Sequence, residues 1–221
     1  MSRVLSISNL YDKKYENIPL SGVWADAFGK QEYGGAWLIY GSEKNGKSSF
    51  ALMLANYLSK IGSTLYVSAE EGTIETFKDA CMRAGIERSN QNLKVLEYYP
   101  LEALKKDHFE KRRKPRFVFI DNLTVYKGEI TDEVIFSLTK EYPDITIIYI
   151  AHEEDNEPYM AVGKACKRFA RVIVRVIGLT AFFSGRLGSK GGEFVIDTEK
   201  AALIHGDKIN NKNNTENENN D

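Results

Sequence analysis

One eight-residue segment of the sequence has the composition of a phosphate-binding loop. It fits the pattern G-x-x-x-x-G-K-[ST] and reads Gly41-Ser42-Glu43-Lys44-Asn45-Gly46-Lys47-Ser48. The glycines let the backbone wrap so that several N–H groups converge on phosphate oxygens. In such a loop Lys47 reaches the β- and γ-phosphates of a nucleotide, and the Ser48 hydroxyl ligates Mg²⁺. This segment, extended by Ser49, is the predicted binding site for ATP and Mg²⁺.

The residues on either side of the loop have the pattern that such a loop requires. The apolar run 36–40 (AWLIY) precedes it and predicts a strand. Residues 47–61 follow it with apolar side chains at helical spacing, and predict a helix that Gly62 ends. The N-terminus of that helix adds about half a positive charge at the phosphate position. This strand–loop–helix order disfavours the alternative, a glycine-rich turn that matches by chance.

An acidic residue ends another apolar run and is a candidate metal ligand. Asp121 follows residues 117–120 (FVFI), which is the Walker B pattern. Ligands collect at the carboxyl ends of strands in open parallel sheets, so this carboxylate is expected beside the phosphate-binding loop. We predict that Asp121 and Ser48 hold the Mg²⁺. The alternative is an ordinary strand-ending aspartate in a turn.

Two further polar positions follow apolar strands in the same way. Glu70 and Glu71 come directly after residues 64–68 (TLYVS), where a carboxylate can polarise an attacking water as general base. The alternative is that both are solvated acids beside the positive end of the next helix. His152 follows residues 145–151 and can contact the γ-phosphate, or it can be a plain loop residue.

Short apolar runs alternate with amphipathic segments along most of the chain. Further strands are predicted at 64–68, 93–99, 116–120 and 145–151. Further helices are predicted at 73–84, 101–114, 131–142 and 159–170. This alternation indicates an α/β fold with a mostly parallel central sheet and helices on both faces. Four closely spaced segments predict an antiparallel C-terminal edge: 172–177, 181–183, 193–196 and 201–204.

The composition is typical of a soluble globular protein. Of the 221 residues, 43% are hydrophobic and 28% charged, and 30 basic residues balance 31 acidic ones. No apolar run approaches the roughly 20 residues of a membrane span, and no signal peptide is recognisable, so no membrane partner is predicted. The two cysteines, Cys81 and Cys166, are far apart and indicate free thiols in a reducing cytoplasm. The asparagine-rich residues 207–221 predict a disordered tail.

The combination of these motifs resembles the RecA-type ATPases, which include recombinases, replicative hexameric helicases, RadA and KaiC-like proteins. The resemblance covers residues 22–206, after an N-terminal segment of residues 1–21. It depends on four stretches in this order: GSEKNGKSS, LYVSAEEG, FVFIDNL and IIYIAH. It implies a RecA-like P-loop fold and Mg²⁺-dependent ATP hydrolysis, with Glu70 as the catalytic base. His152 falls at the sensor position, where the family usually has glutamine.

The resemblance also implies an arginine that acts between subunits. Residues 183–196 resemble the K-x-R-x-G…G hairpin of hexameric helicases, in which the arginine reaches the γ-phosphate of the neighbouring subunit. Arg186 falls on that position, and Ser184 falls where the family often has lysine. A homo-oligomer, either a ring or a filament, is therefore expected. The alternative is that Arg186 is a solvated residue of a hairpin turn.

DNA is a candidate partner on the same resemblance, with single-stranded DNA favoured, in recombination, repair or replication. The family contacts DNA through loops that follow the Walker B and sensor strands. Here the second of these loops, residues 152–158, is acidic and a poor match for phosphates. The alternative is a regulatory ATPase that acts on a protein partner without moving along DNA.

Two basic sets can contact phosphates in this sequence. One is the cluster at 105–116, which is expected at the amino end of the Walker B strand, far from the nucleotide, and which can equally be a solvated helix face. The other is nearer the sensor strand and is the better candidate for a DNA contact. It consists of Lys164, Lys167, Arg168, Arg171 and Arg175.

Overall fold

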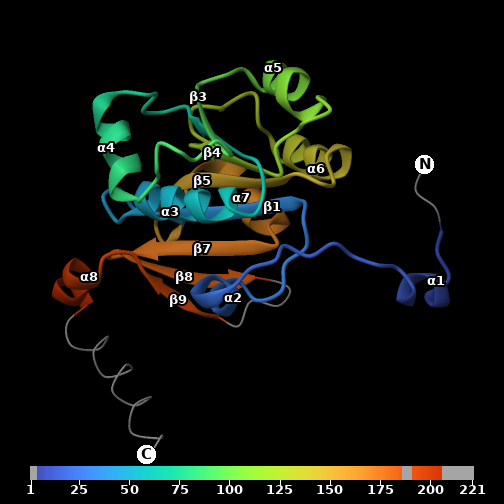
Figure 1. Cartoon of the computed structure of the whole chain (residues 1–221), viewed down its shortest axis with the longest axis horizontal. Coiled ribbons are helices and arrows are strands. Elements are labelled where there is room, and N and C mark those ends of the chain that lie inside the picture. The colour runs from blue at the N-terminus through green and yellow to red at the C-terminus, as the bar shows by residue number, and fades with distance from the viewer. Residues whose placement is uncertain (1–3, 186–190, 206–221) are drawn as a thin grey trace, which may run out of the picture.

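A computed structural model describes residues 4–185 and 191–205, and in them an α/β architecture built on a nine-stranded sheet (Figure 1). The strands are β1 (Gly35–Gly41), β2 (Thr64–Ser68), β3 (Leu93–Glu97), β4 (Phe117–Asp121), β5 (Thr146–Glu154), β6 (Glu157–Pro158), β7 (Val172–Ile177), β8 (Thr180–Gly185) and β9 (Glu193–Val195). The main path runs β3-β2-β4-β5-β1-β7-β8-β9, and β6 pairs with β5. The six strands from β3 to β7 along this path are parallel, whereas β8 and β9 are antiparallel. The predicted fold class is confirmed.

Helices cover both faces of this sheet. They are α1 (Ile7–Tyr11), α2 (Gly22–Phe28), α3 (Lys47–Ser59), α4 (Glu75–Arg83), α5 (Leu101–Leu104), α6 (Asp132–Glu141), α7 (Met160–Phe169) and α8 (Thr198–His205), with a π-helical turn, η1 (Lys105–Phe109), after α5. One hydrophobic core lies under α2, α3 and α4, and a second lies under α5, α6 and α7. Alternate residues of β1 contribute to the two cores, Trp37 to the first and Leu38 to the second.

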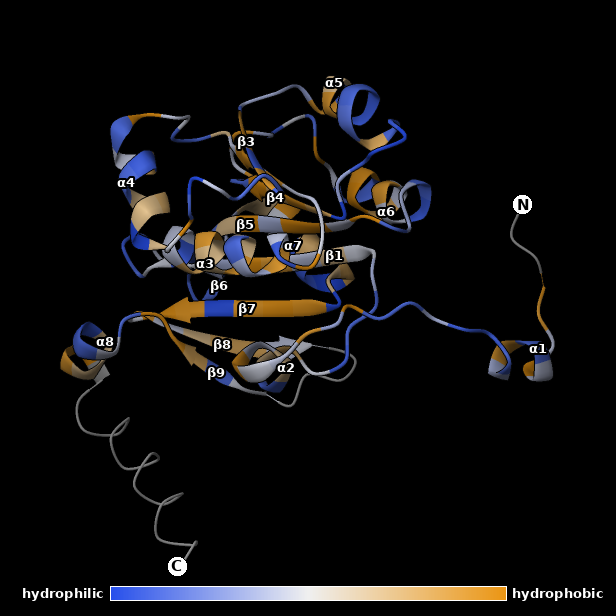
Figure 2. Cartoon of the chain, viewed as in Figure 1, coloured by the Kyte–Doolittle hydropathy of each residue, from blue (hydrophilic) through white to orange (hydrophobic). Residues whose placement is uncertain are grey.

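Burial on both faces explains why the central strands read as continuous apolar runs. All seven residues of β1 and the first six of β5 are buried. Figure 2 shows β7 as an almost unbroken hydrophobic arrow, interrupted by one hydrophilic position, whereas α4 and α6 are mixed. Polar residues are therefore confined to the ends of these strands. Because β2, β4 and β5 are parallel, the polar residues at their carboxyl ends lie at one edge of the sheet.

The strand register sets which polar residues meet at the carboxyl edge. Ser68 pairs with Asp121, Asp121 with Ile150, and Gly41 with His152. The residue that follows β2 and the residue that follows β4 therefore come level with Tyr40, the next-to-last residue of β1. The phosphate-binding loop begins at that end.

Three local predictions were wrong. The strand predicted at 201–204 lies within α8, because Asp197 accepts a hydrogen bond from the N–H of Lys200 and caps a helix of good helix-forming residues. The helix predicted at 101–114 consists of α5 and η1 and ends at Phe109, the last residue of η1. The loop predicted at 152–158 is a hairpin, since β5 continues to Glu154 and returns through Asp155 and Asn156, both with positive φ, into β6.

The chain outside the sheet layers adds little to the site. The short helix α1 stands apart from the body, with Val4, Ile7 and Tyr11 exposed (Figure 1). Within the described ranges, none of the helices combines the length and apolar character needed to cross a membrane. The predicted tail at 207–221 lies outside the described residues.

Candidate functional site

The phosphate-binding loop connects the end of β1 to the start of α3. Gly46 adopts a φ of 95°, a left-handed conformation that residues with a side chain rarely take. A Cβ added at Gly41 would lie 2.2 Å from the carbonyl oxygen of Val176 on β7. Both glycines of the motif are therefore required by the backbone, one by its dihedral angle and the other by a close approach of a neighbouring strand.

Asn45 ties the loop to the turn between β7 and β8. Its Oδ1 accepts a hydrogen bond of 2.7 Å from the N–H of Gly178, and its carbonyl accepts one of 3.1 Å from Leu179. Hydrogen bonds from the β7–β8 turn therefore stabilise the loop conformation, in addition to the glycines of the loop itself. Asn45 was predicted as a nucleotide contact, and its structural role could not be read from the motif.

Lys47 is almost fully buried at the start of α3. Its Nζ donates a hydrogen bond of 2.8 Å to the carbonyl oxygen of Ser42. Burial lowers the pKa of Lys47, and nearby carboxylates, of which Asp121 has the largest effect, raise it in opposition. A hollow of about 360 Å³ opens beside this ammonium group. Its lining consists of Lys44, Gly46, Lys47, Ser48, Ser49, Glu71 and Leu179.

Asp121 ends β4 and points to the same side of the sheet as α3. Its Oδ2 accepts a hydrogen bond of 2.6 Å from the hydroxyl of Tyr66. The pKa of Asp121 is raised from 3.8 to about 6; burial is the largest cause, Glu70 and Glu71 also raise it, and the Tyr66 hydroxyl and Lys47 oppose the rise. A half-buried carboxylate that acts electrostatically on a buried ammonium fits a Mg²⁺ ligand, because Mg²⁺ commonly takes one or two protein oxygens and keeps water in its other positions.

Glu70, Asn122 and His152 form a hydrogen-bonded group beside Asp121. The side-chain amide of Asn122 donates to Glu70 Oε2 and lies 2.9 Å from His152 Nε2. His152 Nε2 also lies 3.4 Å from Glu70 Oε1. The structure therefore brings together the predicted base and the predicted sensor, through a residue that the sequence analysis did not select. Asn122 directly follows the Walker B aspartate, and this position is the feature by which the sequence could have identified it as a site residue.

The neighbouring Glu71 lies elsewhere. It lines the hollow beside Lys47, whereas Glu70 faces Asn122 and His152. The two adjacent acids therefore have different surroundings, and their contributions can be separated by substitution.

A half-buried ion pair lies on the opposite face of the sheet from this group. Arg175 of β7 makes two hydrogen bonds of 2.8 Å to Glu153, and one of 2.6 Å to Asn156. Only 7% of the Glu153 side chain is exposed, and the Ser42 hydroxyl lies 3.5 Å from its Oε1. Of the same basic set, Lys167 pairs with Glu157 at 2.9 Å. These two cations are thus engaged by the acidic hairpin and are poorly placed for the DNA contact suggested by the sequence.

The other basic cluster lies at the amino edge of the sheet, as expected. It surrounds a hollow of about 470 Å³ that includes Lys94, Lys111, Arg113 and Lys114. Lys114 pairs with Asp144 at 3.1 Å, and within the described part of the chain no ion pair involves Lys94 or Arg113. This cluster shares no residue with the site at the carboxyl edge.

Arg186, the predicted arginine finger, lies outside the described residues. It stays a prediction from the resemblance. The strand that leads to it, β8, ends at Gly185 and is the next-to-last strand of the antiparallel edge.

Comparison with solved structures shows that the fold is RecA-like. The flagellar accessory protein FlaH from Methanocaldococcus jannaschii matches with a TM-score of 0.54 and 21% sequence identity, over 81% of this chain and 84% of that chain. An ATP synthase subunit, NeqB from Nanoarcheaum equitans, matches with a TM-score of 0.52 and 15% identity, over 74% of this chain and 50% of that one. No family model and no curated protein matches the sequence.

Proposed function

We propose that this chain is a Mg²⁺-dependent ATPase. The observation that carries the proposal is the convergence of three features at one sheet edge. They are a phosphate-binding loop, a half-buried aspartate near a buried lysine, and a glutamate that accepts a hydrogen bond from Asn122 and lies 3.4 Å from a histidine. In this proposal residues 41–49 hold the phosphates, and Ser48 and Asp121 hold Mg²⁺. The ion neutralises the charge of the phosphate oxygens when it is bound.

The residues have distinct roles in hydrolysis. Glu70 takes a proton from the attacking water, whose oxygen bonds to the γ-phosphorus as the bond to the β–γ bridging oxygen breaks. Lys47 stabilises the negative charge on the transferred group, and its burial strengthens that interaction. His152 contacts the γ-phosphate. The test is phosphate release from ATP by the purified chain, with Mg²⁺ and with EDTA. The proposal predicts turnover that requires Mg²⁺, and no release in Mg²⁺ would refute it.

We further propose that the active form is a ring or filament in which Arg186 completes the site of a neighbour. Turnover per subunit should then rise with protein concentration. Arg186→Ala should bind ATP normally and lose up to about 10³–10⁵ in rate. Mixing it with Lys47→Ala subunits should restore some activity, because one variant supplies the loop and the other the arginine. A monomer with concentration-independent turnover would contradict the shared site.

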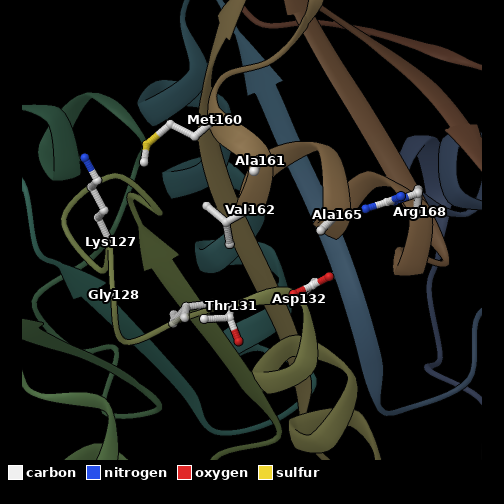
Figure 3. A pocket seen from close by; sticks show the side chains of 10 residues that line it. Lys127, Gly128, Thr131, Asp132, Met160, Ala161, Val162, Ala165 and Arg168 are labelled. Carbon is white, nitrogen blue, oxygen red and sulfur yellow. The ribbon is translucent and has the colours of Figure 1, made fainter.

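The partner in this proposal is a protein. The hairpin β5–β6 is acidic at its exposed turn and engages Arg175 and Lys167, which leaves a poor phosphate-binding surface beside the nucleotide edge. A mixed hollow of about 330 Å³ lies next to it, between the loop after β4 and the helix α7 (Figure 3). Met160, Val162 and Ile130 line it together with Lys127 and Arg168, a composition that suits a protein segment.

DNA dependence, in recombination, repair or replication, is the competing proposal, and the basic cluster at the amino edge supports it. The two are separated by measuring ATP turnover with and without single-stranded DNA. Indifference to DNA supports the protein partner, and stimulation supports the DNA-dependent ATPase. A cytoplasmic location fits either partner and the two free thiols, Cys81 and Cys166.

A further inference from the structure

Asn122 is the most completely buried polar residue of the carboxyl edge. Its exposed fraction is 1%, although it lies in the loop that follows β4. A buried amide must find partners for its oxygen and its two N–H groups, or it costs folding free energy. All three find partners, and they belong to three different segments of the chain.

The hydrogen bonds determine which way the amide faces. Its Oδ1 accepts a bond of 2.8 Å from the backbone N–H of Thr124 and a further bond from the Thr124 hydroxyl. The NH₂ group therefore faces Glu70 and His152. The reverse orientation would set Oδ1 against the Glu70 carboxylate and the NH₂ against a backbone N–H, with donors opposing donors and acceptors opposing acceptors.

The same bonds define how His152 can act. Because Asn122 donates to His152 Nε2, that nitrogen is an acceptor, and the ring proton is on Nδ1. Nδ1 is buried and has no hydrogen-bond partner within residues 4–185 and 191–205. His152 Nε2 therefore cannot also donate to Glu70 Oε1, 3.4 Å away. The amide keeps the base and the histidine adjacent without letting the histidine's proton engage the base.

We propose that Asn122 is a positioning residue that orients Glu70 and His152 for hydrolysis, a role that rests on the proposed ATPase function. Asn122 does not contact the phosphate-binding loop in any hydrogen bond of the described residues. It acts through the carboxylate and the imidazole, which it joins across 52 and 30 residues of sequence. Loss of the two N–H donors should therefore lower the rate of hydrolysis and leave nucleotide binding intact.

Asn122→Asp separates this role from a purely structural one. The aspartate has almost the same shape, and its Oδ1 still accepts from Thr124, so the loop keeps its anchor. It has no N–H to donate to Glu70 or His152, and its second oxygen adds a negative charge beside Glu70, so the uncharged Asn122→Ala must slow turnover as well. We expect kcat to fall by at least about 10-fold, since a misplaced base loses much of the roughly 10²–10⁴-fold that general base catalysis supplies. The Kd for a fluorescent ATP analogue should stay within about 2-fold of the wild type, because uniform binding is untouched.

The double variant with Glu70→Gln gives the decisive measurement. Because Asn122 acts chiefly through Glu70, Asn122→Asp should slow the Glu70→Gln enzyme far less than it slows the wild type, and the small loss that remains is the part that acts through His152. A structural defect would slow both backgrounds equally. The matched control is Thr124→Val, which alters the same loop but keeps the backbone N–H bond to Oδ1 and both amide donors. Its turnover should stay close to that of the wild type.

Three results would overturn the inference: wild-type kcat in Asn122→Asp, equal slowing in the two backgrounds, or a loss of nucleotide affinity that accounts for the slower rate. If Asn122→Asp does not fold, Asn122→Ala is measured in the same two backgrounds against the same criteria. A wild type without ATP hydrolysis would overturn the proposed function and this inference with it. A hydrolysing wild type with an equally active Asn122→Asp would overturn the inference alone.

Discussion

The two edges of the parallel sheet differ in how their charged residues are held. At the carboxyl edge Lys47 and Asn122 are buried and Asp121 is half-buried, and hydrogen bonds connect Asp121 and Asn122 to residues far away in the sequence. At the amino edge Lys94, Lys111 and Arg113 are exposed around an open hollow. The same six parallel strands end at both edges, so the difference comes from the segments that connect them.

The backbone explains the order at the carboxyl edge. The N–H groups of Ala69 and Glu70 both donate to the carbonyl of Asp121, at 2.7 and 3.2 Å, so the turn after β2 is bonded to the end of β4. The N–H of Tyr159 likewise donates a hydrogen bond of 2.7 Å to the carbonyl oxygen of His152. Side chains on such turns have few available positions. Substitutions at this edge should therefore change rate and stability strongly, and the same substitutions at the amino edge should change them little.

Among the substitutions that compare the two edges, the largest expected effect is at Lys47. Lys47→Ala should abolish measurable hydrolysis and weaken nucleotide binding while the fold is retained, since removal of one preorganised charge donor costs about 10²–10³ in rate. Phosphate release and circular dichroism measure the two parts of this expectation. Lys111→Ala at the amino edge is the matched control and should turn over normally. Wild-type turnover in Lys47→Ala would refute the ATPase proposal.

Next in size is the difference between two adjacent acids. Glu70→Gln should keep nucleotide binding and cost at least about 10²-fold in rate, the low end for a positioned base. Glu71→Gln should cost much less, because Glu71 lines the hollow without bonding to Asn122 or His152. Single-turnover rates at saturating ATP measure the effects of both substitutions. If the effects were reversed, the base would be Glu71.

Stability should distinguish the two basic sets. Arg175→Ala leaves the buried carboxylate of Glu153 without its partner, and loss of the partner of a buried charged group costs about 1–3 kcal/mol in the free energy of unfolding when the pair is partly exposed. Arg113→Ala at the amino edge should stay within about 0.5 kcal/mol of the wild type. Urea denaturation measures both. Equal stabilities would mean that the Glu153–Arg175 pair is no stronger than a surface contact.

The last predicted effect is the gain in stability of Asp121→Asn over the wild type, which depends on pH. Burial raises the pKa of this carboxyl from 3.8 to about 6, so the folded state binds the proton more tightly than the unfolded state. The contribution of Asp121 to the free energy of unfolding therefore falls as the pH rises from about 4 to about 6, by roughly 2–3 kcal/mol, and is then constant. Asp121→Asn removes this penalty and can still accept from Tyr66.

Urea denaturation in EDTA at pH 4 to 8 tests this prediction. Asp121→Asn should be more stable than the wild type above pH 6, and the difference should shrink towards pH 4. The control at the amino edge is Asp144→Asn, whose carboxylate is exposed and pairs with Lys114. Its stability difference from the wild type should not follow this pH curve. A parallel curve for both variants would contradict the role of burial.

Much of the architecture was predictable because its signals are local. The strand–loop–helix order around residues 41–48 needs only neighbouring residues, and the alternation of apolar runs with amphipathic segments indicates a parallel sheet. Since parallel strands end at a common edge, the acids after β2 and β4 and the histidine of β5 could be expected together. The antiparallel edge was also expected from a local signal, the close spacing of the last four segments, although the last of them, at 201–204, is helical.

The remaining features depend on contacts between distant residues. Local residue patterns were enough to predict the phosphate-binding loop, the parallel sheet and the edge at which polar residues gather. The contacts of the folded chain were needed to show that Asn122 joins Glu70 to His152, that Asn45 binds the turn after β7, and that Arg175 pairs with Glu153. The physical reason is that an amide or guanidinium group satisfies its hydrogen bonds with whichever partner the folded backbone brings within about 3 Å. That partner is set by strand order and register, and neither can be read from the spacing of residues along the chain.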